Sequence, residues 1–502
     1  MSVEIDLSYF TDKEKIKISQ DLEVRAKESK FNKNPLAIIC FDVVNKDSKG
    51  RIFSDTEVKQ RRVPGEIGKT RQVALLPFSY CYHYFPHVLN KCNESDSGLP
   101  NNCREFSKTE YKFTYTLTED QIQVRKEVFE ILNRTRSVVL AFKTGFGKTL
   151  YGIYLAWKMK MKTCILSHRL SIMNQWMSSI NKACPDAKVQ ILGAGDKLNK
   201  ECDFYILNMS GVGKRRYDDF KDVAVLIVDE IPVVCTEKNA IGLKYFRPKY
   251  LIGLSATPTR TDGLDQIIEH YFGPEIIYRR LIRSFNIYCV YTDFIPETEK
   301  TRAKKLDWNS VLDSVCTSPV LNILTILLVL FFSDKNILIL TKRVEKEGKV
   351  LYNTLKALGE NVEIYTGTKK KFDFNCRILV SSLSKSGIGF DFPKLNMLLL
   401  PADVEEGIEQ YIGRVFRNWD HIPVVVELTH SKYRPFYKHI NTRKDVYRRC
   451  GGTVLPFLNY FPEFKKFEKI EKTKVEEEYV NFKLPDKRKK AAPKSKSKGK
   501  RK

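Results

Sequence analysis

The stretch that decides the fold is Phe142-Lys-Thr-Gly-Phe-Gly-Lys-Thr149. An apolar run, residues 138–142, leads into it, and a helix-like run, residues 150–159, leads out of it. A buried strand, a glycine-rich turn and a helix N-terminus form a phosphate cradle, because backbone N–H groups and the helix dipole both favour an anion there. Phe142 replaces the first glycine of the general pattern G-x-x-x-x-G-K-[ST], so an unrelated glycine turn is the alternative until later motifs are considered.

The residues of this loop suit a nucleoside triphosphate with Mg²⁺. Gly145 and Gly147 let the backbone approach the phosphates closely, and Thr144 belongs to the same loop. Lys148 can reach the β- and γ-phosphates, and the hydroxyl of Thr149 is placed to bind Mg²⁺. We therefore predict that the chain binds a nucleoside triphosphate here.

A second buried strand ends in two carboxylates. Residues 223–228 are apolar, and Asp229 and Glu230 follow them directly. A doubly wound sheet places its ligand at the carboxyl ends of its strands. We expect Asp229 to hold Mg²⁺, directly or through water, and Glu230 to polarise the water that attacks the γ-phosphate. A structural Asp-Glu pair at the start of a loop is the alternative.

Residues 251–258, LIGLSATP, read as another buried strand that ends in hydroxyls. Ser255 and Thr257 can bond to the carboxylate pair and report the state of the phosphate, although such hydroxyls on their own often only form turns. Arg169 follows a buried strand at residues 163–167. It suits a backbone phosphate of a bound nucleic acid strand, and an ordinary surface arginine is the alternative.

Gln121 lies near the start of a helical pattern, about twenty residues ahead of the phosphate loop. Thr118 and Gln121 have the spacing of a capping box, which makes a helix cap one interpretation. A contact to the nucleotide base is the other interpretation, and the local sequence does not decide between them.

A polar stretch near residues 296–307 separates two halves of the chain. The second half repeats the strand–helix rhythm, with strands expected at 336–340 and 376–382 and a helix at 344–358. We therefore expect two α/β layers with a cleft between them.

Gln410, Arg414 and Arg417 fall on one face of a helix in this second half. Two arginines so close together repel each other unless an anion lies beside them. A guanidinium group matches phosphate oxygens and stabilises charge during phosphoryl transfer, so we expect a triphosphate there. A solvated basic face is the alternative.

The net charge of +26 and a pI near 9.4 predict a polyanionic partner, with nucleic acid as the first choice. Twelve cysteines without a C-x-x-C pair indicate reduced thiols in an intracellular, cytosolic or nuclear, setting. The apolar run at residues 320–332 is too short to cross a bilayer, so we expect a buried core helix and no membrane partner.

Four regions are expected along the chain. They are an α+β accessory domain at 1–114, with strands at 35–44 and 73–79, a first α/β domain at 115–295, a second at 296–455, and a charged extension with a basic tail at 456–502. From Lys465 onward we expect disorder, because the sequence is charged and repetitive. The tail suits a nuclear address or a nucleic-acid-binding arm equally well.

In order, FKTGFGKT, IVDE, SATP, SGIGFD and QYIGRVFR resemble the ordered motifs of superfamily 2 helicases, over about Thr116 to Gly452. Within that superfamily the chain is similar to the excision-repair and general transcription-factor helicase branch. It is more similar still to the transcript-release helicases of large cytoplasmic DNA viruses.

This resemblance implies two RecA-like domains that use ATP and Mg²⁺ to act on DNA, or on RNA, with the transcription machinery as a partner. It implies host cytoplasm, virion or nucleus as the location. It assigns Gly389 and Asp391 to the coupling motif of the second domain and Arg414 and Arg417 to the role of arginine fingers. It also favours the base contact for Gln121.

One position departs from the family. The carboxylate box of the family usually runs Asp-Glu-x-His or Asp-Glu-x-Asp, whereas this chain has Asp229-Glu-Ile-Pro232. The missing side chain normally helps to link the box to neighbouring motifs. Two alternatives to an unwinding motor stay open at this point: a translocase that does not unwind, and a nucleic-acid-binding scaffold whose nucleotide site has decayed.

Overall fold

The computed structural model of the chain divides into two compact units, Met1–Leu281 and Ile282–Lys502. The residues that the structure describes are 2–28, 35, 37–46, 52–53, 71–94, 106–142, 145–193, 195–213, 215, 219–236, 239, 242, 246–260, 262–279, 282–301, 303–367, 369, 372–387, 392–404, 407–416 and 421–482.

The first unit is built on a parallel sheet of seven strands. Across the sheet their order is β13 (Ile276–Arg279), β7 (Ser137–Phe142), β12 (Tyr250–Ser255), β11 (Val225–Asp229), β8 (Thr163–Ser167), β10 (Phe204–Asn208) and β9 (Val189–Leu192). The central strands are continuous apolar runs because helices cover both faces of a parallel sheet.

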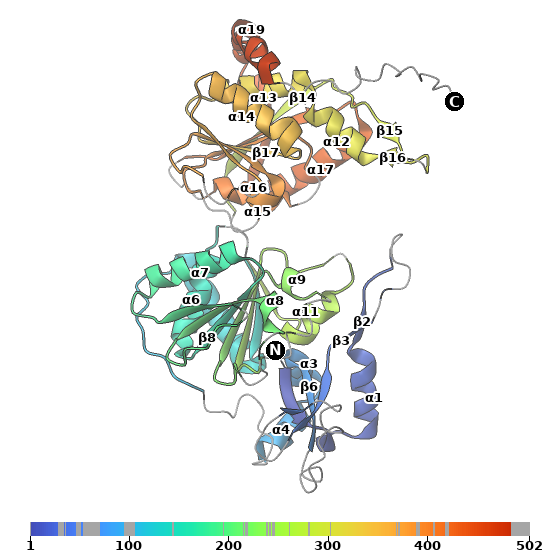
Figure 1. The fold of residues 1–502 in the computed structure, drawn as a ribbon, viewed down its shortest axis with the longest axis vertical. Coiled ribbons are helices and arrows are strands. Elements are labelled where there is room, and N and C mark those ends of the chain that lie inside the picture. The colour runs from blue at the N-terminus through green and yellow to red at the C-terminus, as the bar shows by residue number, and fades with distance from the viewer. Residues whose placement is uncertain are drawn as a thin grey trace, which may run out of the picture. The chain divides into compact units, whose positions relative to one another are not determined.

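Helices flank this sheet on both sides. They are α5 (Glu119–Thr135), α6 (Lys148–Met159), α7 (Leu170–Ala183), α8 (Met209–Val212), α9 (Ile231–Val234) and α11 (Asp265–Phe272). Figure 1 shows α6 and α7 on one face and α8, α9 and α11 on the other. The carboxyl ends of β7, β11 and β12 therefore deliver the phosphate loop, the carboxylates and the hydroxyls to one edge of the sheet.

The N-terminal segment is α+β, as expected. An antiparallel sheet joins β1 (Ser2–Asp6), β6 (Arg71–Pro77), β4 (Asp42–Lys46) and β5 (Ile52–Phe53), beside a hairpin of β2 (Glu23–Arg25) and β3 (Ala37–Ile39). Its helices are α1 (Asp12–Asp21), α3 (Phe78–Tyr84) and α4 (Pro86–Glu94).

This accessory segment and the first parallel sheet share one hydrophobic core, which contains Val3, Phe78 and Tyr271. Polar contacts reinforce the junction. A buried ion pair joins Glu4 to Arg247 at 2.7 Å, and the hydroxyl of Tyr271 donates to the carbonyl of Cys40 at 3.2 Å. Since the boundary is filled with side chains, the accessory segment and the first sheet form one body.

The second unit contains another parallel sheet of seven strands. Across the sheet their order is β18 (Val362–Tyr365), β19 (Ile378–Ser382), β17 (Ile337–Thr341), β20 (Met397–Leu400), β21 (Val424–His430), β14 (Phe285–Thr292) and β22 (Gly452–Pro456). The unit begins at Ile282, ahead of the expected start at residue 296, because β14 pairs with β21 and β22.

Helices and a small hairpin complete the second unit. They are α12 (Trp308–Cys316), α13 (Pro319–Phe331), α14 (Lys349–Ala357), α15 (Leu383–Gly387), α16 (Ile408–Val415), α17 (Arg434–Arg449), α18 (Phe457–Tyr460), α19 (Phe464–Phe482) and the hairpin of β15 (Glu299–Lys300) with β16 (Leu306–Asp307). The helix expected at 344–358 is a π-helical turn, Val344–Gly348, followed by α14.

The apolar run at residues 320–332 forms α13, whose side chains are mostly buried in the core of the second unit, as predicted. In the described part of the chain, no single helix is long and apolar enough to cross a membrane. Only the pair α12 and α13, bent by 51°, meets the length and composition test when the two are taken together.

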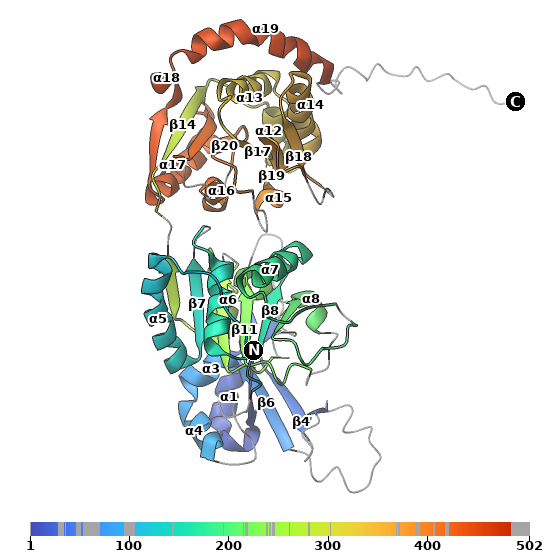
Figure 2. The ribbon, with the colours of Figure 1, turned by 90° about the vertical axis from the view of Figure 1, so that its left-hand side faces the viewer.

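The disorder expected from Lys465 onward is wrong as far as residue 482, because α19 is a packed helix. Phe464, Val475 and Tyr479 are buried, and the hydroxyl of Tyr479 accepts a hydrogen bond from the amide of Asn322 at 3.2 Å. Figure 2 shows α19 lying over α13 and α14. The apolar residues of this helix are widely spaced among many charges, so the sequence alone does not indicate its buried face. The basic tail at 483–502 lies outside the described residues.

Candidate active site

The phosphate loop joins β7 to α6. Gly147 caps the N-terminus of α6, and Lys148 and Thr149 are its first two residues. Gly145 and Gly147 have φ angles of 96° and 85°, a left-handed conformation that glycine adopts without strain. Both glycines are exposed, so their backbone is accessible to a ligand. The predicted strand, turn and helix are confirmed, whereas Thr144 lies outside the described residues.

Phe142, at the missing first glycine, is a core residue. It is fully buried at the end of β7, and its ring centroid lies 4.3 Å from that of Phe146 and 5.5 Å from that of Tyr151. Aromatic pairs at such distances stabilise a core beyond the burial of their area. The aromatic packing thus anchors both the strand that enters the loop and the helix that leaves it.

Gln121 forms the predicted capping box and also supports the phosphate loop. Its backbone N–H donates to the hydroxyl of Thr118, and its side-chain oxygen accepts from the N–H of Thr118 at 3.1 Å. Its amide nitrogen donates to the carbonyl of Phe146 at 2.8 Å. A Cβ at Gly147 would lie 2.8 Å from that nitrogen, and the φ of 85° also favours glycine there. The base contact of Gln121 stays a prediction.

Glu230 faces the lysine of the loop. Its carboxylate accepts a hydrogen bond from Nζ of Lys148 at 3.2 Å, and the hydroxyl of Ser255 lies 3.5 Å from its other oxygen. Glu230 has φ 54° and ψ 62°, a left-handed conformation that costs a non-glycine residue about 1 kcal/mol or more. Such strain is concentrated at functional sites.

The hydroxyls predicted to contact the carboxylates lie at the end of β12, where Ser255 is the last residue of the strand and Thr257 follows two residues later. Ser255 is fully buried, and its Oγ also accepts a hydrogen bond from the N–H of Thr257 at 3.1 Å. The structure therefore brings Lys148, Glu230 and Ser255 together from three strand ends. Thr257 is exposed and joins them through its backbone N–H, so the predicted contact of its hydroxyl with the carboxylates stays a prediction.

Asp229 is buried and has an additional partner that the sequence did not indicate. The indole N–H of Trp176, on α7, donates to its Oδ2 at 2.8 Å. Burial raises the pKa of Asp229 above its usual range, and the charge of Glu230 adds to the rise. Lys148 and the indole hydrogen bond oppose it. Burial and the charge of Glu230 thus disfavour the ionised form of Asp229 unless a cation lies beside it.

The donor set fits a nucleoside triphosphate with Mg²⁺. Asp229 and Glu230 supply two carboxylates against the single ammonium of Lys148, and Thr149 adds a hydroxyl. Hard oxygen ligands are those that Mg²⁺ prefers. The ammonium has three donors and uses one on Glu230, so it retains capacity for phosphate oxygens.

Arg260 connects the carboxylate box to the loop after β12 at Pro232, the position where the family usually has His or Asp. Its guanidinium donates to the main-chain carbonyl of Pro232 and pairs with Asp262. The carbonyl of Asp262 in turn accepts from the N–H of Lys27, in the accessory segment, at 2.7 Å. The carboxylate box is therefore tied to the loop after β12 through a backbone carbonyl, which a substitution in the box does not remove.

Arg169 is exposed at the N-cap of α7, two residues after β8 ends at Ser167. Its position at the end of a central strand agrees with the predicted contact to a nucleic acid phosphate, and that role stays a prediction. The neighbouring His168 is half-buried, and burial lowers its pKa. The ring therefore favours the neutral form at this edge.

Arg414 and Gln410 lie on α16 of the second unit, and Arg414 is only 7% exposed. The hydroxyl of Tyr411 donates to the carbonyl of Leu383 at 3.1 Å, which fixes α16 to α15. The remaining predicted residues of this unit, Gly389, Asp391 and Arg417, lie outside the described residues. The predicted finger role of the arginines therefore stays a prediction.

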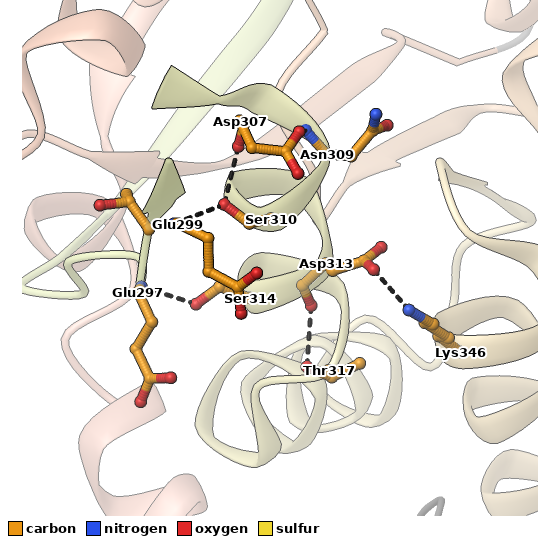
Figure 3. A pocket seen from close by; sticks show the side chains of 10 residues that line it. Glu297, Glu299, Asp307, Asn309, Ser310, Asp313, Ser314, Thr317 and Lys346 are labelled. Carbon is orange, nitrogen blue, oxygen red and sulfur yellow. Dashed lines mark hydrogen bonds and ion pairs between the residues drawn. The ribbon is translucent and has the colours of Figure 1, made fainter. Parts of the chain in front are cut away.

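The second unit also contains a pocket of about 380 Å³. Figure 3 shows its acidic lining, which includes Glu297, Glu299, Asp307 and Asp313. Hydroxyls on α12 accept hydrogen bonds from the backbone N–H groups of Glu297 and Glu299, each at 2.8 Å. None of the predicted site residues lines this pocket.

Residues 114–260 match the family described as "Type III restriction enzyme, res subunit". "Putative helicase 161L" of Invertebrate iridescent virus 6 is 36% identical over 397 residues, which cover 74% of this chain and 89% of the relative. "Putative ATP-dependent RNA helicase L396" of Acanthamoeba polyphaga mimivirus is 25% identical, covering 72% and 73% of the two chains. "Transcript termination protein A18" of Yaba monkey tumor virus is 24% identical, covering 78% and 85%.

The similarity to helicase 161L extends over nearly the whole of that relative, and the ordered motifs stand on two seven-stranded parallel sheets. The two sheets are the two RecA-like domains that the resemblance implied. The chain therefore belongs to the superfamily 2 helicases, in the family that includes helicase 161L, and is a nucleic-acid-dependent ATPase that works as a helicase or translocase.

Proposed function

We propose that this helicase hydrolyses ATP with Mg²⁺ at the edge of the first sheet and uses the energy to move along DNA. The observation that carries the proposal is the direct contact of Lys148 with Glu230, which in turn lies beside Ser255. Three separate strand ends converge there, and each contributes a group that phosphoryl transfer needs.

In this proposal Lys148 binds the β- and γ-phosphates and gives up part of its contact with Glu230 when they arrive. Thr149 and Asp229 hold Mg²⁺, which neutralises phosphate charge when bound. Glu230, released from the lysine, orients and deprotonates the attacking water as a general base. Gln121, already bound to the loop through Phe146, reads the base.

The second unit supplies charge stabilisation and coupling in this proposal. Arg414 and Arg417 are the arginine fingers on the γ-phosphate, with Gln410 beside them. Gly389 and Asp391 belong to the coupling motif. Ser255 and Thr257 transmit the state of the phosphate from the carboxylates to the following loop, which Arg260 also joins.

We propose DNA as the track and transcript release as the task, with the transcription machinery as the partner. The name of A18, a transcript termination protein, supports the task, and the resemblance to the transcription-factor helicase branch supports DNA. The name of L396 specifies RNA, so the track needs a direct comparison. Arg169 and the net charge of +26 favour contacts to phosphates, so binding will weaken steeply with salt.

The test is ATP turnover by the full chain with no nucleic acid, with DNA and with RNA of the same sequence. DNA should stimulate more than RNA. Lys148→Ala should abolish turnover, and Glu230→Gln should bind ATP but turn over at least about 100-fold more slowly, because a general base contributes a factor of that order. Full stimulated turnover by Glu230→Gln would refute the base assignment, and stimulation by RNA alone would refute the DNA track.

Unwinding is tested separately from translocation. Displacement of a labelled strand measures the first, and displacement of a streptavidin block from single-stranded or duplex DNA measures the second. Transcript release requires only translocation against a bound protein, so we expect block displacement even on tracks where strand separation is weak.

A further inference from the structure

Trp176 contacts the carboxylate box from a helix outside the nucleotide-binding motifs. It lies on α7, is fully buried, and donates its indole N–H to Oδ2 of Asp229 at 2.8 Å. A buried indole normally needs a partner for its N–H. The partner here is the carboxylate to which the proposed function assigns the divalent cation.

Close packing fixes the direction of this indole. A Cβ at Gly152, on α6, would lie 3.0 Å from the ring of Trp176 and 3.5 Å from Leu254. Glycine in the interior of a helix is less stable than alanine by about 0.5–1 kcal/mol, so its presence here agrees with a need for close approach. The indole ring of Trp176 therefore packs closely against α6, the helix that follows the phosphate loop.

The chemistry of an indole suits a carboxylate that must also receive a cation. The indole N–H is a donor only and carries no charge. It can fix the rotation of the Asp229 side chain without neutralising it, whereas an ammonium or guanidinium in the same place would compete with the cation. The ammonium at this site, on Lys148, is hydrogen-bonded to Glu230 instead.

We infer that Trp176 is a positioning residue for the divalent cation, because its indole N–H holds the Asp229 carboxylate in the orientation that receives Mg²⁺. The inference rests on the proposed function, since it takes Asp229 as the carboxylate of the cation. Hydrogen-bond donors behind metal ligands typically change metal affinity by about 10–100-fold.

Trp176→Phe in the full chain separates this role from packing. Phenylalanine retains an aromatic ring in the core and removes the N–H. Trp157→Phe is the matched control, because Trp157 lies on α6 of the same unit and its ring stacks on Phe113 at 5.6 Å.

Two measurements are needed. The first is the Mg²⁺ concentration that gives half-maximal ATP turnover. The second, which needs no turnover, is the rise in melting temperature produced by ADP with Mg²⁺ and by ADP with EDTA. For Trp176→Phe we expect the half-maximal Mg²⁺ concentration to rise by about tenfold, the shift with Mg²⁺ and ADP to shrink, and the shift with EDTA to match the wild type. Trp157→Phe should match the wild type in all three.

The inference is overturned if Trp176→Phe folds and its Mg²⁺ dependence and both melting shifts equal those of the wild type. Equal weakening with Mg²⁺ and with EDTA would also overturn it, because that pattern indicates a general packing defect. If Trp176→Phe does not fold, Gly152→Ala decides, since its new methyl group presses on the indole without touching Asp229. A folded Gly152→Ala protein should need more Mg²⁺, and an unchanged requirement would refute the inference.

Asp229→Asn distinguishes this inference from the function on which it rests. If Asp229→Asn keeps the wild-type Mg²⁺ dependence, Asp229 is not the metal ligand and the proposed function fails at that residue. If Asp229→Asn loses Mg²⁺ binding while Trp176→Phe retains it, the proposed function stands and only the role of Trp176 is refuted.

Discussion

The two parallel sheets have the same number of strands but use their charged side chains differently. In the first unit, Lys148 and Glu230 form one partly exposed pair, with side chains 16% and 20% exposed. In the second unit, Arg443 on α17 binds Asp403 at 2.6 Å and Glu427 at 3.1 Å, and all three are buried. One sheet holds an accessible pair, and the other holds a closed network.

This difference in exposure matches two roles. In the proposed function Lys148 must leave Glu230 and bind phosphate, whereas Arg443 keeps its partners and stabilises the fold. A lysine with one partly exposed partner can transfer to phosphate at little cost. The guanidinium of Arg443 also donates to the carbonyl of Val404 at 2.7 Å, so it holds the chain shortly after β20. The helix α17, which carries Arg443, also packs against α16, the helix of Gln410 and Arg414.

The largest effect on stability should follow from breaking the closed network. Arg443→Met removes the guanidinium from the buried carboxylates of Asp403 and Glu427 and leaves His439 as the basic partner of Asp403, so the free energy of unfolding should fall by about 3–5 kcal/mol. Denaturant unfolding of the full chain, followed for the transition of the second unit, measures the loss.

Arg448→Met, on the same helix, is the control. Arg448 and Asp445 are 63% and 71% exposed, and exposed pairs contribute only about 0–1 kcal/mol. If the two variants lost equal stability, the network would not be the scaffold described above, and the contrast between the two sheets would fail.

Much of the first unit could be predicted because local chemistry dictates it. Continuous apolar runs with a glycine turn or an acidic pair at their ends predicted β7, β11 and β12, and the carboxyl edge of a parallel sheet then brought Lys148 and Glu230 together. The capping box of Gln121 was visible from its spacing with Thr118.

Contacts that depend on tertiary packing could not be predicted in this way. Trp176 lies 53 residues from Asp229, and Arg260 binds a backbone carbonyl, which no side-chain motif encodes. The helix α19 could not be predicted because its few apolar side chains, such as Val475 and Tyr479, are buried only when the helix packs on α13. The charged residues of α19 lie mostly on its exposed face, and the contacts of its buried side chains stabilise the helix.

A smaller effect should appear at acidic pH, through His430 in the second unit. Burial lowers its pKa to about 4, with Arg443 lowering it further and Asp403 opposing, while Thr292 contacts its Nδ1 at 2.7 Å. In the unfolded chain the pKa is about 6.5, so below that pH the unfolded state takes up the proton first and stability falls. The loss grows from about 0.4 kcal/mol at pH 6.5 to about 3 kcal/mol near pH 4 and vanishes well above pH 6.5.

The measurement is the free energy of unfolding between pH 7 and pH 4.5 for the wild type and for His430→Gln. The variant removes the titrating group, so its stability should decline less steeply over this range. Identical slopes for the two proteins would show that other groups cause the acid sensitivity, and that burial does not lower the pKa of His430 in the folded protein.

The smallest expected change in stability concerns the nucleotide site of the first unit, where Gln121 supports the phosphate loop. Gln121→Ala removes a capping interaction and the bond to the carbonyl of Phe146, so we expect a loss of about 1 kcal/mol together with a higher KM for ATP. The control is Glu14→Ala, which removes the corresponding partner from the capping box of α1, formed with Thr11 in the same unit.

Both variants should lose similar stability, but only Gln121→Ala should weaken nucleotide binding, because only the side chain of Gln121 holds the phosphate loop. Equal KM values in both variants would mean that Gln121 serves as a cap alone and that the loop keeps its shape through its glycines and the packing of Phe142.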